Sequence, residues 1–417
     1  MLFPINRVSE KANVINVVKL ANRLKNMEYA IRDVAAIAEK VAQRKRVHYL
    51  NIGDPGLFDA FQTPKYICDS LCKATVDGKN NYANSLGVLE LRKAIVEYER
   101  KKNKIDLPMD NILITSGVSE AIFFATAGLI ERGTEMLLPG PCYSTYRSYV
   151  EFFEGKGVDY RLVEEEGWNP DVDDLRKKIN ENTAAILISS PNNPTGRMWK
   201  PKTMKEIFDI AGEHNLIVIS DEIYDRIVFD NEYACPGSIA KEIPIIGMNG
   251  FSKAHMATGW RLGYMYFLDP DGQMEELKLN IEKLARTRLC ANTPAQYAAI
   301  ESYKKPQDHT AKMVSILRKQ RDYSMKRIQE LDLITCVEPD GAFYMFPKIN
   351  LNGIWKDDRE FVLDLLQETG VCFVYGSGFG EYGKGHFRST FLPPIEELGE
   401  VFDKINVYIK KKMNHKP

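Results

Sequence analysis

A lysine and an arginine stand eight residues apart in a segment that could approach a phosphate closely. Lys253 lies in residues 251–255 (FSKAH) and Arg261 in residues 258–264 (TGWRLGY). A lysine amine is a nucleophile and a base, and arginine offers two parallel N–H groups to a phosphate. The glycines beside Arg261 allow the backbone to come close to a ligand. A lone lysine after a strand is normally a solvated surface group, so this interpretation needs support from other segments.

Two further segments place polar side chains directly after apolar runs. Asp221 ends the run 216–220, and Tyr224 follows three residues later, which in a helical turn places both side chains on one side. Asn193 stands in residues 190–196 (SPNNPTG), where two prolines make a rigid turn that can hold an amide still. Taken alone, Asp221 is more typical of a helix N-cap, and the Asn193 segment is equally typical of a plain turn.

A third segment, residues 115–121 (TSGVSEA), has a strand that breaks at Ser-Gly and enters a helix. Exposed backbone N–H groups and hydroxyls at a helix N-terminus suit a phosphate. The same pattern is also typical of a simple capping box, which binds no ligand.

In their order along the chain, the four segments resemble those of the class I and II pyridoxal-phosphate aminotransferases of fold type I, and the likeness runs through essentially the whole chain. Within that family the likeness is greatest to alanine (glutamate–pyruvate) aminotransferases. It rests on residues 289–296 (LCANTPAQ) and 341–348 (GAFYMFPK). Archaeal and bacterial aspartate aminotransferases are similar too.

The resemblance implies pyridoxal 5′-phosphate as the cofactor and assigns a role to each segment. Lys253 would bind the cofactor covalently and then act as the base for the proton on the substrate Cα. Asp221 would keep the pyridine nitrogen protonated, so that the ring withdraws electrons. The other implied contacts are Asn193 and Tyr224 at the 3′ oxygen, Arg261, Ser119 and the Val118 amide at the phosphate, and Tyr143 stacked on the ring.

The resemblance also implies a substrate clamp and a shared site. Arg388, in residues 387–391, matches the arginine that binds the substrate α-carboxylate, a two-pronged task for which lysine is a poor substitute. Gly53 matches a glycine beside the same carboxylate, where Asn193 also belongs. Tyr82, in residues 81–87, matches a tyrosine that reaches the phosphate of a partner subunit. We therefore expect a homodimer.

One departure from the family pattern concerns the phosphate. Many relatives carry a Ser or Thr three residues before the lysine, and this chain has Gly250 there. Ser252 is adjacent to Lys253 and is a candidate replacement. His255 and Trp260 flank the same residues and are interpreted as packing groups.

The expected reaction is a ping-pong transfer of an α-amino group to a 2-oxo acid, with alanine and glutamate as amino donors and pyruvate and 2-oxoglutarate as acceptors. Aspartate transamination is the first alternative, and a carbon–sulfur lyase on the same scaffold is the second, because the fold does not fix which Cα bond breaks. A DNA-binding regulator is disfavoured, because no basic helix-turn-helix module is present. A dicarboxylic substrate needs a second cation, and the candidates are Arg32, Arg286 and Arg288.

The elements that must position these residues are strands alternating with helices. Apolar runs at 111–115, 184–189, 216–220, 244–248 and 262–267 predict buried strands, with helical spacing between several of them, for example at 202–213. The prediction is an α/β fold, with a mostly parallel seven-stranded sheet between helices and a smaller α+β domain. A long charged helix at 308–331 and short strands at 334–337, 342–346, 371–374 and 387–391 belong to the smaller domain. The predicted divisions are 1–64 (N-terminal arm and first part of the small domain), 65–305 (large domain) and 306–417 (small domain).

Composition excludes several other classes. The 417 residues include 56 Lys and Arg against 57 Asp and Glu, so the net charge of −1 gives no pull toward nucleic acid or an anionic membrane. The longest apolar uncharged stretch, residues 121–130, is shorter than the roughly 18–20 residues of a membrane span. Seven scattered cysteines and no secretory signal predict a cytoplasmic protein with free thiols, and the six histidines show no metal-ligand spacing.

Overall fold

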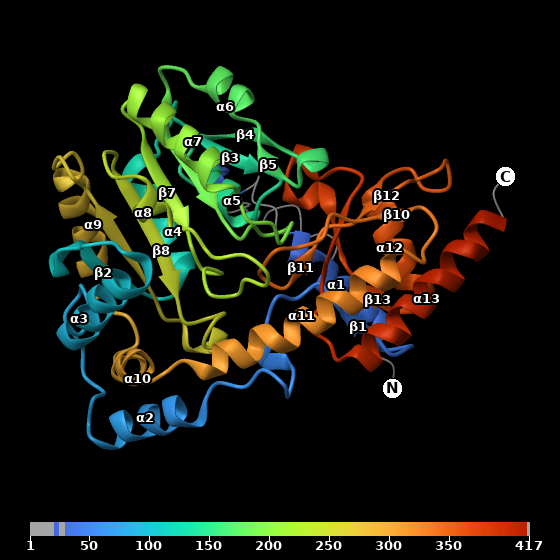
Figure 1. The fold of residues 1–417 in the computed structure, drawn as a ribbon, viewed down its shortest axis with the longest axis horizontal. Helices are drawn as coiled ribbons and strands as arrows, with labels where there is room; N and C mark the ends of the chain where they lie inside the picture. The colour runs from blue at the N-terminus through green and yellow to red at the C-terminus, as the bar shows by residue number, and fades with distance from the viewer. Residues whose placement is uncertain (1–20, 25–29, 415–417) are drawn as a thin grey trace, which may run out of the picture.

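The chain folds around one large twisted sheet with helices on both faces (Figure 1). The structure is a computed structural model that describes residues 21–24 and 30–414, so residues 1–20 and 25–29 of the predicted division 1–64 lie outside the described residues. The sheet has the strand order β2-β9-β8-β7-β6-β3-β4-β5. Its strands are β2 (Ile112–Thr115), β3 (Glu135–Gly140), β4 (Lys156–Val163), β5 (Asn169–Pro170), β6 (Thr183–Ser189), β7 (Ile217–Asp221), β8 (Ile245–Gly250) and β9 (Gly263–Leu268).

Neighbouring strands in the middle of this sheet run parallel. The pairs β3–β4, β3–β6, β6–β7 and β7–β8 are parallel, whereas β9 is antiparallel to both of its neighbours, β2 and β8. The predicted sheet has seven strands, and the structure adds an eighth, because the two residues of β5 pair antiparallel with the end of β4. Parallel strands end at one edge of the sheet, and that edge is where functional side chains gather in such folds.

The two faces of the sheet bury separate hydrophobic cores. Val218 and Ile245 belong to one core, and their chain neighbours Ile219 and Ile246 belong to the other. This alternation is the period of two expected of a strand buried on both faces. The helices around the sheet are α2 (Lys65–Val76), α3 (Leu89–Tyr98), α4 (Val118–Leu129), α5 (Thr145–Phe152), α6 (Val172–Lys178), α7 (Pro201–Glu213), α8 (Pro236–Ile239), α9 (Glu275–Arg288) and α10 (Thr293–Lys304).

A second group of elements lies beside the large sheet (Figure 1). The long helix α11 (Asp308–Ile328) leads to it. Its helices are α1 (Ala30–Ala42), α12 (Asp358–Thr369) and α13 (Ile395–Asn414), and its strands are β1 (His48–Tyr49), β10 (Ile334–Thr335), β11 (Tyr344–Met345), β12 (Lys348–Ile349), β13 (Val371–Cys372), β14 (Val374–Tyr375) and β15 (Phe387–Thr390). The parallel pair β1–β13 brings the N-terminal segment to this group. The domain boundaries after residues 64 and 305 remain a prediction.

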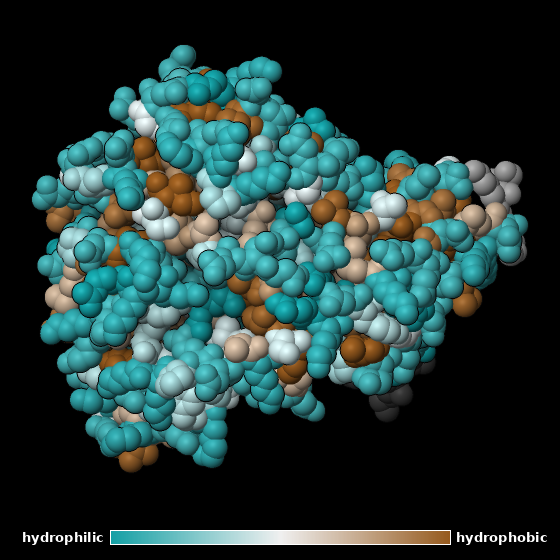
Figure 2. Space-filling view, viewed as in Figure 1, coloured by the Kyte–Doolittle hydropathy of each residue, from teal (hydrophilic) through white to brown (hydrophobic). Residues whose placement is uncertain are grey.

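The surface drawn in Figure 2 is largely hydrophilic, with apolar residues scattered between charged ones. None of the described helices is both long and apolar enough to span a bilayer. The predicted helix at 308–331 begins at Asp308 as expected, and its helical hydrogen bonding ends three residues early, at Ile328.

Candidate active site

A cavity of about 520 Å³ lies at the carboxyl ends of β6, β7 and β8. Its volume is within the range of small-molecule sites. Eleven of the predicted site residues line it: Gly53, Val118, Ser119, Tyr143, Asn193, Asp221, Tyr224, Ser252, Lys253, Arg261 and Arg388. Tyr82 does not, and its side chain is 77 % exposed. The structure therefore brings together residues that are up to 335 positions apart in the chain, from Gly53 to Arg388.

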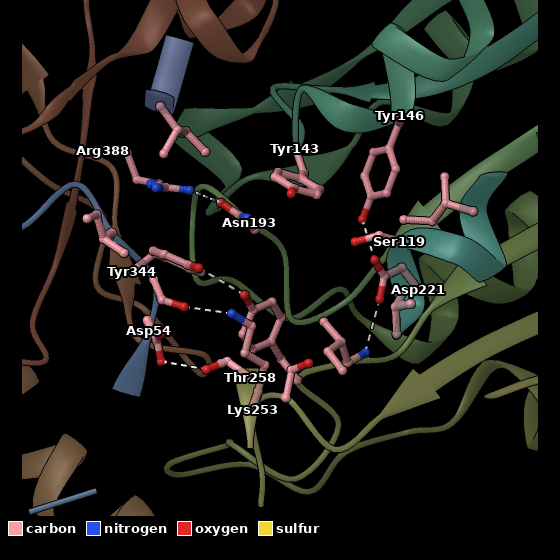
Figure 3. Close-up of a pocket in the computed structure, with 18 of the residues that line it drawn as sticks. Asp54, Ser119, Tyr143, Tyr146, Asn193, Asp221, Lys253, Thr258, Tyr344 and Arg388 are labelled. Atoms are coloured by element: carbon pink, nitrogen blue, oxygen red, sulfur yellow. Dashed lines mark hydrogen bonds between the residues drawn. The ribbon is translucent and has the colours of Figure 1, made fainter. Parts of the chain in front are cut away.

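The Lys253 amine lies inside the cavity, where Nζ donates a hydrogen bond to the Gly53 carbonyl at 2.6 Å (Figure 3). Desolvation lowers the pKa of this amine to about 8, while the Asp54 carboxylate partly opposes the change. The positive charges of Arg388 and Arg261 lower the pKa further. A substantial part of the Lys253 amine is therefore neutral near pH 8, as a nucleophile or base requires.

Asp221, the last residue of β7, presents its carboxylate to the same cavity. Oδ2 accepts a hydrogen bond from the Tyr146 hydroxyl at 2.7 Å, and Oδ1 accepts one from the Ile223 N–H at 3.1 Å (Figure 3). Burial raises the pKa of Asp221, and the two hydrogen bonds and the Lys253 charge oppose the rise. A buried carboxylate of this kind suits a cationic N–H partner.

Arg388 is a buried guanidinium on β15, only 1 % exposed. Nη1 donates to Asn193 Oδ1 at 2.9 Å and Nη2 donates to the Asn51 carbonyl at 2.6 Å, while Nε has no partner. Its Cζ lies 4.5 Å from the centre of the Tyr344 ring. No carboxylate of the described chain lies within ion-pair distance of Arg388. A buried charge without a counter-ion is costly, so this site is suited to an anionic ligand.

A second place for an anion lies at the N-terminus of α4. Gly117 precedes this helix with φ 80°, a conformation that favours glycine. A Cβ on Gly117 would also lie 2.7 Å from Arg261 Nη2, so glycine allows the guanidinium to approach the helix end. Free N–H groups, a helix dipole and an arginine together fit a phosphate.

The absence of a hydroxyl at position 250 has a packing reason. A Cβ on Gly250 would lie 3.0 Å from the Leu262 carbonyl oxygen and 3.1 Å from Gly263 Cα, because β8 and β9 pair closely there. The neighbouring backbone would have to shift to admit a serine. Ser252, by contrast, lies in the cavity wall.

Four polar residues of the cavity wall, Asp54, Tyr146, Thr258 and Tyr344, were not predicted from the sequence. Tyr146 donates to Asp221, and the hydroxyls of Tyr344 and Tyr224 lie 2.9 Å apart. The Thr258 hydroxyl donates to Asp54 Oδ1 at 2.9 Å. Tyr146 could have been predicted, because it follows Tyr143 by three residues and so shares its side of a helical turn. The Thr258–Asp54 contact could not, because it joins segments 204 positions apart in the chain.

Of the three arginines considered for a second carboxylate, only Arg32 lines the cavity. It lies in the first turn of α1, between Ile31 and Asp33, and its side chain is exposed. The other two arginines form ion pairs away from the cavity lining. Arg286 Nη2 lies 3.4 Å from Glu282 Oε2 on α9, and Arg288 Nε lies 3.2 Å from Glu120 Oε1.

The donor set fits the phosphorylated cofactor that the resemblance implies. An amine of lowered pKa, a buried carboxylate and an anion site formed by a helix end and an arginine match its aldehyde, its ring nitrogen and its phosphate. Arg388, with no carboxylate nearby, provides a further anion site at the opposite side of the cavity from Asp221 (Figure 3).

Comparison with known proteins shows the family of the chain. The family model described as aminotransferase class I and II matches residues 46–405. The glutamate–pyruvate aminotransferase AlaA of Haemophilus influenzae is 34 % identical over 398 residues, which cover 93 % of this chain and 98 % of that protein. A probable aspartate aminotransferase of Methanocaldococcus jannaschii is 33 % identical over 381 residues, or 91 % of this chain and 96 % of that one. The solved structure of an alanine aminotransferase from Pyrococcus furiosus superposes with a TM-score of 0.92, at 49 % identity, over 94 % of this chain and 100 % of that one.

Proposed function

The chain belongs to the class I and II aminotransferases, and we propose that its substrates are alanine with 2-oxoglutarate and, in the reverse direction, glutamate with pyruvate. It is a pyridoxal-phosphate-dependent aminotransferase. When bound, pyridoxal phosphate accepts the amino group and withdraws electrons from the substrate Cα.

We assign the site residues as follows. Lys253 Nζ binds the cofactor and later removes the proton from the substrate Cα, a role that its pKa of about 8 supports. The Asp221 carboxylate, held by the Tyr146 hydroxyl, keeps a proton on the ring nitrogen. Remaining contacts are Val118, Ser119, Ser252 and Arg261 to the phosphate, and Asn193, Tyr143 and Tyr224 to the ring.

Arg388 takes the α-carboxylate that every substrate shares, next to Gly53 and Asn193. Its two Nη atoms are held by Asn193 and the Asn51 carbonyl, which fixes the plane of the guanidinium. A fixed, buried, two-pronged donor binds a carboxylate in one orientation. The substrate Cα is thereby held in one place relative to Lys253.

The observation that favours the alanine–glutamate pair is the cavity wall formed by α1. Ile31 and Ala35 give this wall an apolar part that suits the methyl group of alanine and pyruvate. Arg32, on the same helix, offers a cation to the distal carboxylate of glutamate and 2-oxoglutarate. One wall can thus accept both a small apolar and a long acidic side chain. Aspartate is the alternative donor, because Arg32 would also attract its shorter carboxylate.

Two variants separate the roles of the arginines. Arg388→Lys should reduce kcat/KM for alanine, aspartate and glutamate alike, by roughly ten- to a hundredfold, since a charge-assisted hydrogen bond contributes about 1.5–3 kcal/mol. Arg32→Met should reduce kcat/KM about tenfold for glutamate and 2-oxoglutarate, and leave alanine and pyruvate nearly unchanged. Lys40→Met, an exposed change on the same helix, is the matched control.

A coupled assay of the wild-type enzyme decides the substrate pair. We expect the highest kcat/KM for alanine with 2-oxoglutarate and for glutamate with pyruvate. Aspartate turned over faster than alanine would replace the proposal by aspartate transamination. Release of sulfide or ammonia without an acceptor would indicate a lyase.

We further propose that the enzyme acts as a homodimer in the cytoplasm. The support for a dimer is Tyr82, which is exposed and lies outside the cavity of its own chain. A tyrosine of that family position contacts the phosphate of a partner subunit.

A further inference from the structure

A hydrogen-bonded network lies behind Lys253 and takes no part in the roles assigned above. We call it the Arg226 network, formed by Arg226, His255, His309 and Thr310. Arg226 Nη2 donates to the Thr310 hydroxyl at 3.0 Å, and this hydroxyl donates to the Ala254 carbonyl at 3.3 Å. Arg226 Nη1 is 3.4 Å from His255 Nε2, and His255 Nδ1 is 3.2 Å from His309 Nε2.

The chemistry of the donors fixes where each proton lies. A guanidinium can only donate, so His255 Nε2 accepts and carries no proton. His255 Nδ1 therefore holds the proton of the neutral ring and donates to His309 Nε2. His309 must then carry its own proton on Nδ1, which has no partner in the described chain. Burial lowers the pKa of His255 well below its usual value and that of His309 to about 4, which agrees with two neutral rings.

The network joins three segments that meet at the reacting lysine. Arg226 follows the cavity residue Tyr224 by two positions, and Ala254 and His255 directly follow Lys253. His309 and Thr310 lie in the first turn of α11, the long helix that runs from the large sheet to the second group of elements (Figure 1). No acidic side chain of the described residues lies within ion-pair distance of Arg226, so its hydrogen bonds go to this network.

We propose that the Arg226 network positions Lys253, and that Arg226 and Thr310 are positioning residues for its Nζ. The Thr310 hydroxyl holds the Ala254 carbonyl, and Arg226 holds both that hydroxyl and the ring of His255. The backbone on the C-terminal side of Lys253 is thus anchored to α11. The inference rests on Lys253 being the reacting amine in the proposed function.

A pair of substitutions at position 310 tests the inference. Thr310→Val removes the hydroxyl and keeps the shape, whereas Thr310→Ser keeps the hydroxyl. With the full chain and bound cofactor, Thr310→Val should lower kcat about tenfold with little change in KM, because a misplaced reacting group slows the chemical step. It should also shift the pH at which the visible absorption of the bound cofactor titrates. Thr310→Ser should restore both quantities to near the wild-type values.

Thr126→Val is the matched control, because the Thr126 hydroxyl is also buried and donates to a backbone carbonyl, that of Ile122, on α4. It should change thermal stability alone. Equal kcat and absorption profiles in Thr310→Val and the wild type would overturn the inference. If Thr310→Val does not fold, the pair His309→Gln and His309→Phe takes its place, since only glutamine offers an acceptor to His255.

A measurement on the cofactor-free protein separates this inference from the proposed function. The rate at which acetic anhydride acylates Lys253, read by peptide mapping, should differ between Thr310→Val and the wild type, and Thr310→Ser should match the wild type. This result does not depend on transamination. An unchanged acylation rate in Thr310→Val would contradict positioning by the network, even if the enzyme transfers amino groups as proposed.

Discussion

The Tyr146 hydroxyl partly lowers the raised pKa of the buried Asp221 carboxylate by donating a hydrogen bond to it. Tyr146 is 2 % exposed, and its ring packs edge-on against that of Tyr143, with 5.6 Å between ring centres. Its hydroxyl is therefore held at Asp221 by packing. A donor to a carboxylate stabilises the charged form and so opposes the rise in pKa that burial causes.

Tyr146→Phe should remove the hydrogen bond to Asp221 while leaving the aromatic ring in place. The pKa of Asp221 should rise further, so the carboxylate becomes a poorer partner for a protonated ring nitrogen. We expect kcat to fall roughly tenfold, in line with about 1.5 kcal/mol for a hydrogen bond to a charged group. Steady-state kinetics with saturating cofactor is the measurement.

Tyr160→Phe is the control for Tyr146→Phe, because Tyr160 is also fully buried and its hydroxyl donates to the Leu187 carbonyl, outside the cavity lining. An equal loss of kcat in the two variants would show that Tyr146 acts only on stability.

At the scale of elements, two buried glutamates connect β9 to the segments that follow β7 and α3. Glu222 accepts a hydrogen bond from the Tyr266 hydroxyl at 2.7 Å, and Glu99, on the short π-helical turn after α3, accepts one from Tyr264. A Cβ on Gly247 would lie 1.9 Å from the Tyr266 ring, so glycine in β8 gives this ring its space. Burial raises the pKa of Glu99 to about 7 and that of Glu222 to about 8.

These shifts predict a specific pH dependence of stability. An unfolded glutamate titrates near pH 4.3, so between about pH 5 and 8 the folded state binds more protons at Glu222 than the unfolded state does. The free energy of unfolding should therefore fall as pH rises, by at most about 1.4 kcal/mol per pH unit for this group. Glu222→Gln cannot titrate and should lack this loss.

The difference between the wild type and Glu222→Gln reports on Glu222 and its coupling to Glu99, because the titrations of groups that do not interact with Glu222 cancel. Urea unfolding between pH 5 and pH 8 should show the wild type losing stability relative to the variant. The exposed change Glu232→Gln should leave the slope unchanged. A wild-type slope equal to that of Glu222→Gln would mean that Glu222 is already ionised in the folded state.

The sequence was sufficient for most of the sheet strands with strong apolar runs and for the residues that follow them. The strands at β6, β7 and β8 and the placement of Asn193, Asp221 and Lys253 at the cavity follow from local pattern and family likeness. Neither β3 nor β4 was predicted. The apolar run of β3 is short, and Asp159 and Arg161 interrupt the apolar residues of β4. The Arg226 network was out of reach, since it joins segments 29, 54 and 84 positions apart.

At the scale of the whole molecule, we expect two chains to assemble into a dimer. Tyr82 is 77 % exposed, and Val76, at the end of α2, is 85 % exposed. Large apolar side chains at the surface are common at interfaces between subunits. We expect sedimentation of the cofactor-bound enzyme to give a dimer. Tyr82→Phe should keep the dimer and weaken cofactor binding about tenfold, through loss of one hydrogen bond to a charged phosphate.

A monomeric species with full activity would contradict the shared site, because Tyr82 would then have no partner phosphate to reach. Unchanged cofactor affinity in Tyr82→Phe, with the dimer intact, would instead remove this residue from the site and leave the assembly as predicted.

The most direct test of the account is to identify the residue that binds the cofactor. Borohydride reduction of the cofactor-bound enzyme should abolish its visible absorption and fix one pyridoxyl group per chain. Peptide mapping by mass spectrometry should find that group on Lys253, and Lys253→Ala should carry none and lose amino transfer. A label on any other lysine, or full transfer by Lys253→Ala, would contradict the assignment of the active site.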